Sequence, residues 1–236
     1  ILLILGTAAM FHSLNVKNNT VKKELPITLL ITTLFAVLLS DHIFDKSLPN
    51  SFTRSDGIIL LLFFLVFIYY LIAMMRRKID VDDNLPSMSL KKAILFTIVG
   101  IVAIVIGSNL VVDSASLIAE ALGVSERMIS LTIIALGTSL PELVTSVAAT
   151  RKGEYDIAIG NVVGSNIFNI GIVIGVPVVL FGGVSRIAFS YIDLIVMLMS
   201  ALLLFLFSFR DYKITKSEGV MFLTLFIIYY SYVIFG

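Results

Sequence analysis

The stretch GTSLPELVTS, residues 137–146, places the carboxylate of Glu142 next to a proline inside an otherwise apolar segment. On an α-helix its oxygen-containing side chains share one face, because they are spaced three, four and seven residues apart: Thr138, Ser139, Glu142, Thr145 and Ser146. Pro141 has no N–H for the Gly137 carbonyl and its ring pushes against that carbonyl, so the helix should kink or unwind just before Glu142. The carbonyl oxygens from Ala135 to Gly137 would then become available as further ligands.

The following stretch, YDIAIGNVVGSNIFNIGIVIGVPVV at 155–179, contains two stripes on one helix. Asn161, Ser165 and Asn169 are spaced four residues apart and form a polar stripe. Four glycines lie on another face and predict close approach to a neighbouring helix: Gly160, Gly164, Gly171 and Gly175. We assign one set of polar side chains to a binding site: Thr138, Ser139, Glu142, Ser165 and Asn169. A second set is interpreted as structural hydrogen-bonding groups: Thr145, Ser146, Asn161 and Asn166.

Carboxylate, hydroxyl, amide and carbonyl oxygens are the ligands of a hard cation. The chain contains no cysteine, and its two histidines, His12 and His42, lie near the ends of apolar segments. Calcium takes about six to eight oxygen ligands in flexible geometry, and sodium accepts the same ligand types. Glu142 supplies the single negative charge of the proposed set, so a divalent ion would need a second carboxylate from elsewhere.

The composition places these residues in a lipid bilayer. Of 236 residues, 58% are hydrophobic and 14% are charged, with a mean hydropathy of +1.05, far outside the range of soluble globular domains. A net charge of +1 gives no basis for binding nucleic acid. Residues 1–11 form an apolar segment about half as long as a membrane span. Seven others approach the span length of about 20 residues: 26–40, 57–75, 93–112, 128–150, 157–181, 188–209 and 219–235.

Basic residues predict how these segments are oriented. Four alternate connections contain 13 of the 17 lysines and arginines: residues 15–24, 76–92, 151–156 and 210–218. By the positive-inside rule these connections are cytoplasmic. At about 1.5 Å per residue, Glu142 lies roughly 13 Å from the cytoplasmic end at Arg151 and roughly 20 Å from the other end. An unpaired charge at that depth costs at least about 2.5–3.5 kcal/mol, so a compensating partner is expected.

Two sequence matches indicate an internal repeat. ILLILG at 1–6 matches IGIVIG at 170–175 with an offset of 169. TRSDGIILLLF at 53–63 matches TKSEGVMFLTL at 215–225 with an offset of 162. Because an odd number of spans separates the copies, they are predicted to be inverted relative to each other, as in many secondary transporters.

This repeat predicts the domain organisation. Residues 1–75 are assigned to the remainder of a first repeat, with spans three to five. Residues 76–92 form a short cytoplasmic linker, and residues 93–236 form the second repeat, spans six to ten, which contains the ion-binding motifs. The fold class is therefore an all-α polytopic membrane protein with an inverted-repeat transporter fold. We expect about ten spans in the parent, with about seven and a half here and about 80 residues before Ile1.

The sequences ALGTSLPELVTSVAAT at 135–150 and GNVVGSNIFNIG at 160–171 resemble the second α-repeat of the cation/calcium antiporter superfamily, in its sodium/calcium exchanger branch of prokaryotic type. The recognisable segments are similar in layout to spans three to ten of that fold. The resemblance implies cation ligation by five side chains and by the Ala135 carbonyl: Thr138, Ser139, Glu142, Ser165 and Asn169. Some relatives have Asp where this chain has Asn169, which leaves the ion stoichiometry open.

The resemblance implies antiport of sodium and calcium by alternating access, in a prokaryotic plasma membrane and without a cofactor. Its expected partners are the two transported ions, the lipid bilayer and the preceding spans of the same protein. The proton-coupled branch typically has a different glutamate motif, so GTSLPE favours sodium coupling, and proton/calcium antiport stays open. A cation channel could use the same ligands. An enzyme is disfavoured because no HExxH, GxSxG or paired Asp motif occurs in these spans.

Overall fold

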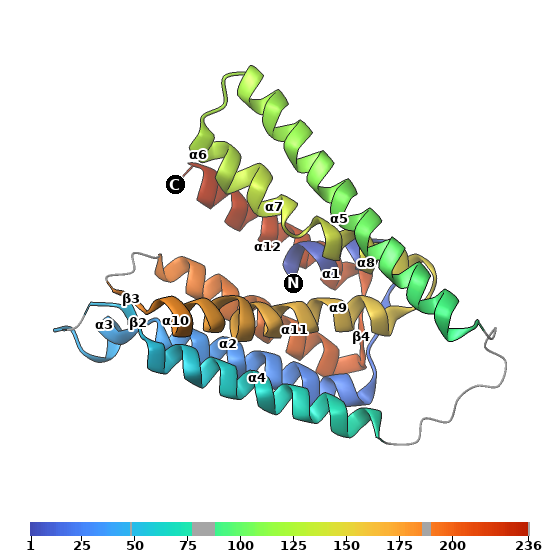
Figure 1. The fold of residues 1–236 in the computed structure, drawn as a ribbon, viewed down its shortest axis with the longest axis horizontal. Helices are drawn as coiled ribbons and strands as arrows, with labels where there is room; N and C mark the ends of the chain where they lie inside the picture. Colours follow the sequence, from blue (N-terminus) through green and yellow to red (C-terminus); the bar gives the residue numbers. More distant parts are fainter. Residues whose placement is uncertain (48, 77–87, 186–189, 236) are drawn as a thin grey trace.

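The chain forms a layered arrangement of helices joined at their ends by two short strand pairs (Figure 1). The computed structural model describes residues 1–47, 49–76, 88–185 and 190–235. The helices are α1 (Leu2–Phe11), α2 (Leu25–Leu38), α3 (Asp41–Phe44), α4 (Arg54–Met75), α5 (Leu90–Ala121), α6 (Glu126–Ile129), α7 (Ala135–Gly137), α8 (Leu140–Arg151), α9 (Tyr155–Phe168), α10 (Gly175–Phe181), α11 (Tyr191–Asp211) and α12 (Lys216–Phe235). Three π-helical segments continue them: η1 (Thr20–Glu24), η2 (Ser130–Ile134) and η3 (Asn169–Ile174).

Five described helices are long and apolar enough to cross a bilayer: Arg54–Met75, Leu90–Ala121, Tyr155–Phe181, Tyr191–Asp211 and Lys216–Phe235. The all-helical membrane class predicted from the composition is confirmed. The number of uninterrupted long spans is smaller than the seven predicted. Segment 26–40 forms the 14-residue helix α2, which continues from η1, and segment 128–150 is broken into shorter pieces.

The break in segment 128–150 lies where Pro141 predicts it. Helix α7 ends at Gly137, Thr138 and Ser139 form a turn, and α8 begins at Leu140. Because proline in the first turn of a helix gives up no helical hydrogen bond, Pro141 starts α8 more readily than it would continue α7. The prediction of an interruption just before Glu142 is confirmed.

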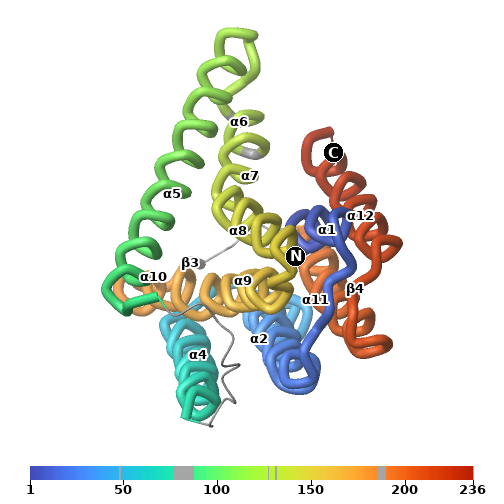
Figure 2. Tube along the Cα trace, turned by 90° about the vertical axis from the view of Figure 1, so that its right-hand side faces the viewer, coloured from blue at the N-terminus to red at the C-terminus, as the bar shows by residue number. Residues whose placement is uncertain are grey.

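Helix α5 is longer than the predicted segment 93–112. It spans 32 residues from Leu90 to Ala121 and ends shortly before Gly123, which has a φ of +80°. Its second half contains the helix-forming run SASLIAEA, so hydropathy falls there while helix propensity does not. Figure 2 shows α5 leaning away from the bundle, with its far end beside α6. Residues 77–87 of the predicted linker 76–92 lie outside the described residues.

Strand pairs join the two halves of the chain at opposite ends of the molecule (Figure 1). Strand β1 (Leu14–Asn15) pairs antiparallel with β4 (Lys213–Ile214). Strand β2 (Ser51–Phe52) pairs antiparallel with β3 (Val184–Ser185). Three of the four connections predicted to be cytoplasmic lie at the β1–β4 end. The pairing of β1 with β4 brings residues 15–24 and 210–218 together, and the ion pair of Lys17 with Asp156 adds residues 151–156.

Close glycine contacts link the same two halves. Helix α1 packs along α12, and a Cβ added at Gly6 would lie 3.1 Å from the Gly219 carbonyl oxygen. Helix α10 packs along α4, and a Cβ added at Gly57 would lie 3.1 Å from the Gly175 carbonyl oxygen. The offsets of 169 and 162 relate Gly6 to Gly175 and Gly57 to Gly219. The two helix crossings are therefore made by matching residues.

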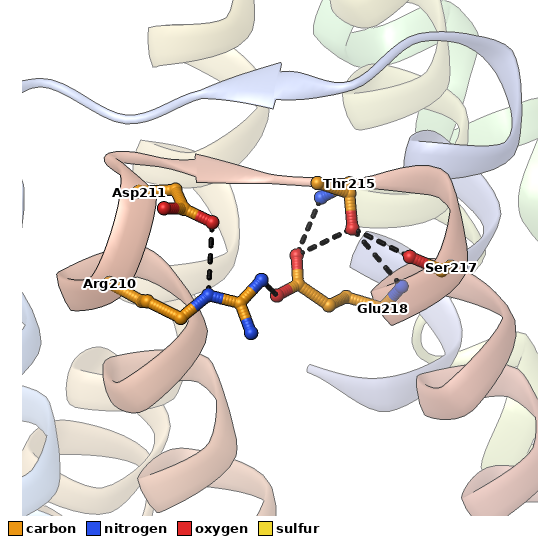
Figure 3. Close-up of polar contacts among 5 residues, drawn as sticks. All are labelled: Arg210, Asp211, Thr215, Ser217 and Glu218. Atoms are coloured by element: carbon orange, nitrogen blue, oxygen red, sulfur yellow. Dashed lines mark hydrogen bonds and ion pairs between the residues drawn. The ribbon is translucent and has the colours of Figure 1, made fainter.

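The matching segments TRSDG at 53–57 and TKSEG at 215–219 each cap the start of a helix, but their capping carboxylates have different further partners. At the start of α4, Asp56 accepts hydrogen bonds from the Thr53 backbone N–H and hydroxyl, both at 2.7 Å. At the start of α12, Glu218 accepts from the Thr215 N–H at 2.7 Å and hydroxyl at 2.8 Å. Glu218 is only 8% exposed and also binds Arg210 Nη2 of α11 at 3.1 Å (Figure 3). The second cap therefore also ties α12 to α11.

Candidate cation site

A cavity of about 380 Å³ lies where α8, the helix Tyr155–Phe181 and the start of α1 meet. Figure 2 shows α7, α8 and α9 converging beside the N-terminus. The described residues that line the cavity are Ile1, Ile4, Thr138, Ser139, Glu142, Ser165, Asn166, Asn169 and Val173. Five of the six predicted site residues therefore meet in one cavity, although they come from two different helices.

Glu142 is the group with the greatest need for a partner. Its Oε2 atom is buried, and among the residues that the structure describes no group donates a hydrogen bond to it. Buried polar atoms in folded proteins nearly always have a partner, and an unpaired carboxylate in a membrane is costly. A bound cation or proton in the cavity would supply that partner.

The broken backbone positions Thr138 and Ser139 one turn before Glu142. The Thr138 N–H still donates to the Ile134 carbonyl at 3.1 Å, whereas the Ser139 N–H donates to the Leu136 carbonyl at 3.0 Å. The backbone thus changes from a four-residue to a three-residue hydrogen-bond step at this turn. Both side chains reach the cavity as a result.

Ala135 is the predicted ligand that does not line this cavity. Its carbonyl oxygen accepts a hydrogen bond from Thr138 Oγ1 at 2.9 Å. Carbonyl groups point along the helix axis toward the next turn, which directs the Ala135 oxygen to the Thr138 hydroxyl. Ala135 instead lines a neighbouring cavity of about 300 Å³, which shares Ser139 with the first one.

A polar side chain holds the two helices of the site together. Asn161 on α9 donates from Nδ2 to the Glu142 backbone carbonyl at 3.1 Å and to Ser146 Oγ at 3.0 Å. Ser146 Oγ is within 3.3 Å of the Ala158 carbonyl, and Thr145 Oγ1 donates to the Pro141 carbonyl at 2.8 Å. These contacts fix the backbone that presents Glu142, which agrees with the structural interpretation of Thr145, Ser146 and Asn161.

Comparison with known proteins identifies the family to which this chain belongs. The sequence profile of the sodium/calcium exchanger protein family matches residues 1–73 and 92–235. The chain belongs to the sodium/calcium exchanger family. Both motif-containing stretches lie inside the matched ranges, so the resemblance noted in the sequence is confirmed at the level of the family.

Individual relatives of this exchanger family agree with that assignment. The chain is 34% identical to the inner membrane protein YrbG of Escherichia coli, over 89% of this chain and 65% of YrbG. It is 47% identical to the sodium/calcium exchanger MaX1 of Methanosarcina acetivorans, over 49% of this chain and 33% of MaX1. A solved structure of the sodium-calcium exchanger NCX_Mj superposes with a TM-score of 0.78 at 30% identity, over 97% of this chain and 70% of that one. The chain thus spans about two thirds of YrbG and 70% of NCX_Mj.

Asn166 is the cavity residue that the sequence reasoning placed elsewhere. Its Nδ2 donates to the Val162 carbonyl at 2.7 Å, as expected of a structural side chain, yet the residue also lines the cavity. The available signal was its position three residues before Asn169, which puts both on neighbouring faces of the same helix. In this exchanger-family chain Asn166 therefore joins the candidate site.

The glycine stripe of the same helix packs over only half its length. A Cβ added at Gly171 would lie 2.8 Å from Phe64 Cβ, and one at Gly175 would lie 3.3 Å from the Gly57 carbonyl oxygen. At Gly160 and Gly164 an added Cβ would meet no described atom within 4 Å. The predicted close packing is confirmed for Gly171 and Gly175 and is not observed for the other two within the described residues.

Proposed function

We propose that this exchanger-family transporter is a secondary active antiporter that exchanges sodium for calcium. The observation that supports this most directly is the buried Oε2 of Glu142, which has no hydrogen-bond partner among the described residues and lies in an oxygen-lined cavity beside a break in the helix. Hydroxyl, amide and carboxylate oxygens suit hard cations, and both sodium and calcium use them. Irregular backbone at membrane depth is tolerated where it faces protein or a polar cavity, as at Thr138 and Ser139.

The cation ligands in this proposal are the side chains that converge on the cavity. Glu142 provides the charge, and Thr138, Ser139, Ser165 and Asn169 provide neutral oxygens. The Ala135 carbonyl oxygen is retained as a ligand. Because it accepts a hydrogen bond from Thr138 Oγ1 in this structure, we propose that it becomes available when that hydroxyl turns toward an ion. Asn166 is added because it lines the same cavity.

The architecture of this proposal is a pair of inverted repeats, residues 1–75 and 93–236, connected by the linker 76–92. Its support is the crosswise pairing of β1 with β4 and β2 with β3, together with the matching contacts of Gly6 with Gly219 and Gly57 with Gly175. In transporters of this type the substrate site lies near mid-membrane where the repeats meet. The lining of the cavity by Ile1 and Ile4, together with residues of α8 and α9, supports such a location.

Exchange in this proposal follows from competition for the same oxygens. Sodium moving down its gradient occupies ligands that calcium needs and drives calcium toward the opposite side as the site opens alternately to each face. The connections 15–24, 151–156 and 210–218 are assigned to the cytoplasmic face because of their lysines and arginines. The inner membrane location of the bacterial relative YrbG supports a prokaryotic plasma membrane.

The test is calcium-45 uptake into proteoliposomes that contain the protein and are loaded with sodium. We expect uptake when the outside medium is sodium-free and a marked loss when sodium is equal on both sides. Uptake that ignores sodium but follows a pH gradient would replace the proposal with proton/calcium antiport. If uptake needed neither gradient and the protein showed a unitary conductance, a cation channel would replace the proposed antiporter.

A further inference from the structure

The helix break at Thr138 and Ser139 divides the segment Glu126–Arg151 into two parts joined by a turn. The part before the break, here called the upstream segment, is residues 126–137 and comprises α6, η2 and α7. The part after the break is α8, which contains Glu142. Hinges in proteins are usually a few residues at the ends of such elements. Thr138 and Ser139 line the cation cavity, so their position there depends on where the upstream segment is held.

A hydrogen bond from α12 holds the upstream segment. The Tyr230 hydroxyl donates to the Thr132 backbone carbonyl at 2.8 Å, although the two residues are 98 positions apart in the chain. Thr132 lies in η2, which packs against α12. The other side-chain hydrogen bonds described for the upstream segment stay within residues 125–138. Among the described residues, Tyr230 therefore supplies the hydrogen bond that joins this segment to another part of the fold.

Both partners of this hydrogen bond are prepared for it. A π turn contains one more residue than an α turn, so the backbone pairing of η2 shifts and carbonyl groups there can accept a further donor. On α12, the Tyr230 ring stacks on the Phe226 ring, with 5.2 Å between the centroids and 22° between the planes. The stacked ring has little freedom to rotate, so its hydroxyl stays directed at η2.

The two described neighbours of the upstream segment differ in what else they contact. Helix α5 packs against α6, η2, α7 and α8, and a Cβ added at Gly137 would collide with Val112 of α5. Its main described contacts are thus with the broken segment itself. Helix α12 packs along α1, and its capping residue Glu218 binds Arg210 of α11. Within the described chain, α12 is therefore the neighbour that connects the upstream segment to the rest of the bundle.

We propose that Tyr230 is a positioning residue of the cation site. Its hydroxyl holds the upstream segment against α12 and thereby fixes where Thr138 and Ser139 lie relative to Glu142. The identity of the ions rests on the proposed function, whereas the hydrogen bond does not. A site that opens alternately to each face needs a part of its wall that can be released. One hydrogen bond, which shifts an equilibrium by about fivefold, biases such a movement without preventing it.

The position of the upstream segment can be measured without transport. Spin labels at Glu126→Cys and Phe235→Cys mark this segment and the end of α12, and both positions are exposed. The 236-residue chain contains no cysteine of its own. Double electron–electron resonance in nanodiscs free of sodium and calcium gives the populations of long and short distances between the labels. We expect Tyr230→Phe, which removes only the hydroxyl, to raise the ratio of long to short distances about fivefold.

The matched control is Tyr229→Phe on the same helix. The Tyr229 hydroxyl donates to Asp193 Oδ1 at 3.0 Å and so ties α12 to α11 rather than to η2. We expect this variant to change the distance ratio by less than about twofold, because the hydrogen bond to Thr132 remains. An unchanged ratio in Tyr230→Phe, or an equal rise in the two variants, overturns the proposal.

Calcium uptake distinguishes a positioning role from a merely structural one. We expect Tyr230→Phe to weaken the apparent affinities for calcium and for sodium by the same factor, up to about fivefold, because both ions bind the same population of correctly positioned sites. A lower maximal rate with both affinities unchanged would mean only less folded protein and would overturn the proposal. A shifted distance ratio in a protein whose calcium uptake ignores sodium would reject sodium/calcium exchange and retain the positioning role of Tyr230.

Discussion

The two walls of the cation cavity are built in different ways. One wall is the segment Glu126–Arg151, which is interrupted at Thr138 and Ser139, and the other is the uninterrupted helix Tyr155–Phe181. Each contains a proline. Pro141 coincides with a break, whereas Pro177 lies in α10 just after the π segment η3, and the helix continues to Phe181. A π segment widens the preceding turn and so offers another way to accommodate the ring.

The two walls also differ in charge and in packing. The broken wall supplies Glu142, whereas the continuous wall supplies neutral side chains only. The continuous helix is held by Gly171 and Gly175 against α4, and 39% of its apolar window is buried. Helix α5, which crosses the broken wall at Gly137, has only 6% of its window buried. Helix α4, the neighbour of the continuous wall, has 11% of its window buried, so the two neighbouring helices differ much less than the walls differ in charge.

Removing the charge of the broken wall should have the largest effect. We expect Glu142→Gln to lower sodium-dependent calcium uptake by more than about 100-fold, because the site loses its negative ligand while the shape of the side chain is kept. The matched control is Glu120→Gln on the exposed surface of α5, which should leave uptake unchanged. Sodium-dependent uptake that survives in Glu142→Gln would exclude Glu142 as a ligand.

The neutral wall should contribute less than the charged one. We expect Asn169→Ala to weaken the apparent calcium affinity by up to about 100-fold, because an amide oxygen is lost from the cavity. Thr145→Ala is the comparison, since its hydroxyl is already bonded to the Pro141 carbonyl. The concentration dependence of calcium uptake measures both. Equal effects of the two substitutions would contradict the assignment of Asn169 to the site.

The proline of the broken wall should matter more than that of the continuous wall. Pro141→Ala restores an N–H that can bond to the Gly137 carbonyl and so favours an unbroken helix. We expect uptake to fall by about tenfold, as for residues that orient a metal ligand. Pro177→Ala should change uptake by less than about twofold. The reverse order would show that the helix break does not position the ligands.

Packing of the continuous wall gives the smallest expected effect, and it concerns stability. Gly171→Ala brings a methyl group against Phe64 Cβ, and such overpacking costs about 1–3 kcal/mol. Gly164→Ala meets no described atom within 4 Å and should gain up to about 1 kcal/mol of helix propensity. Thermal unfolding in detergent distinguishes them, with a lower midpoint expected for Gly171→Ala only. A lower midpoint for Gly164→Ala as well would mean that another helix covers that position.

Much of this fold follows from local sequence. Hydropathy located the apolar segments, Pro141 located the break, and the position of Gly123 coincides with the end of α5. The length of α5 was underestimated because hydropathy declines at Asp113 and Glu120 while helix propensity persists. Asn166 was assigned a structural role only, because helical spacing does not say how far a cavity extends around the helix.

The sequence by itself predicted which oxygen-containing residues could bind a cation and determined that they lie in a membrane protein, since side-chain chemistry and hydropathy are properties of the chain. It also determined the helix break, because proline acts within one turn. Only the tertiary structure decided that Ser165 and Asn169 line the same cavity as Glu142, and that Gly171 rather than Gly164 contacts another helix. These depend on the rotation and crossing of helices, which are set by contacts between residues far apart in the chain.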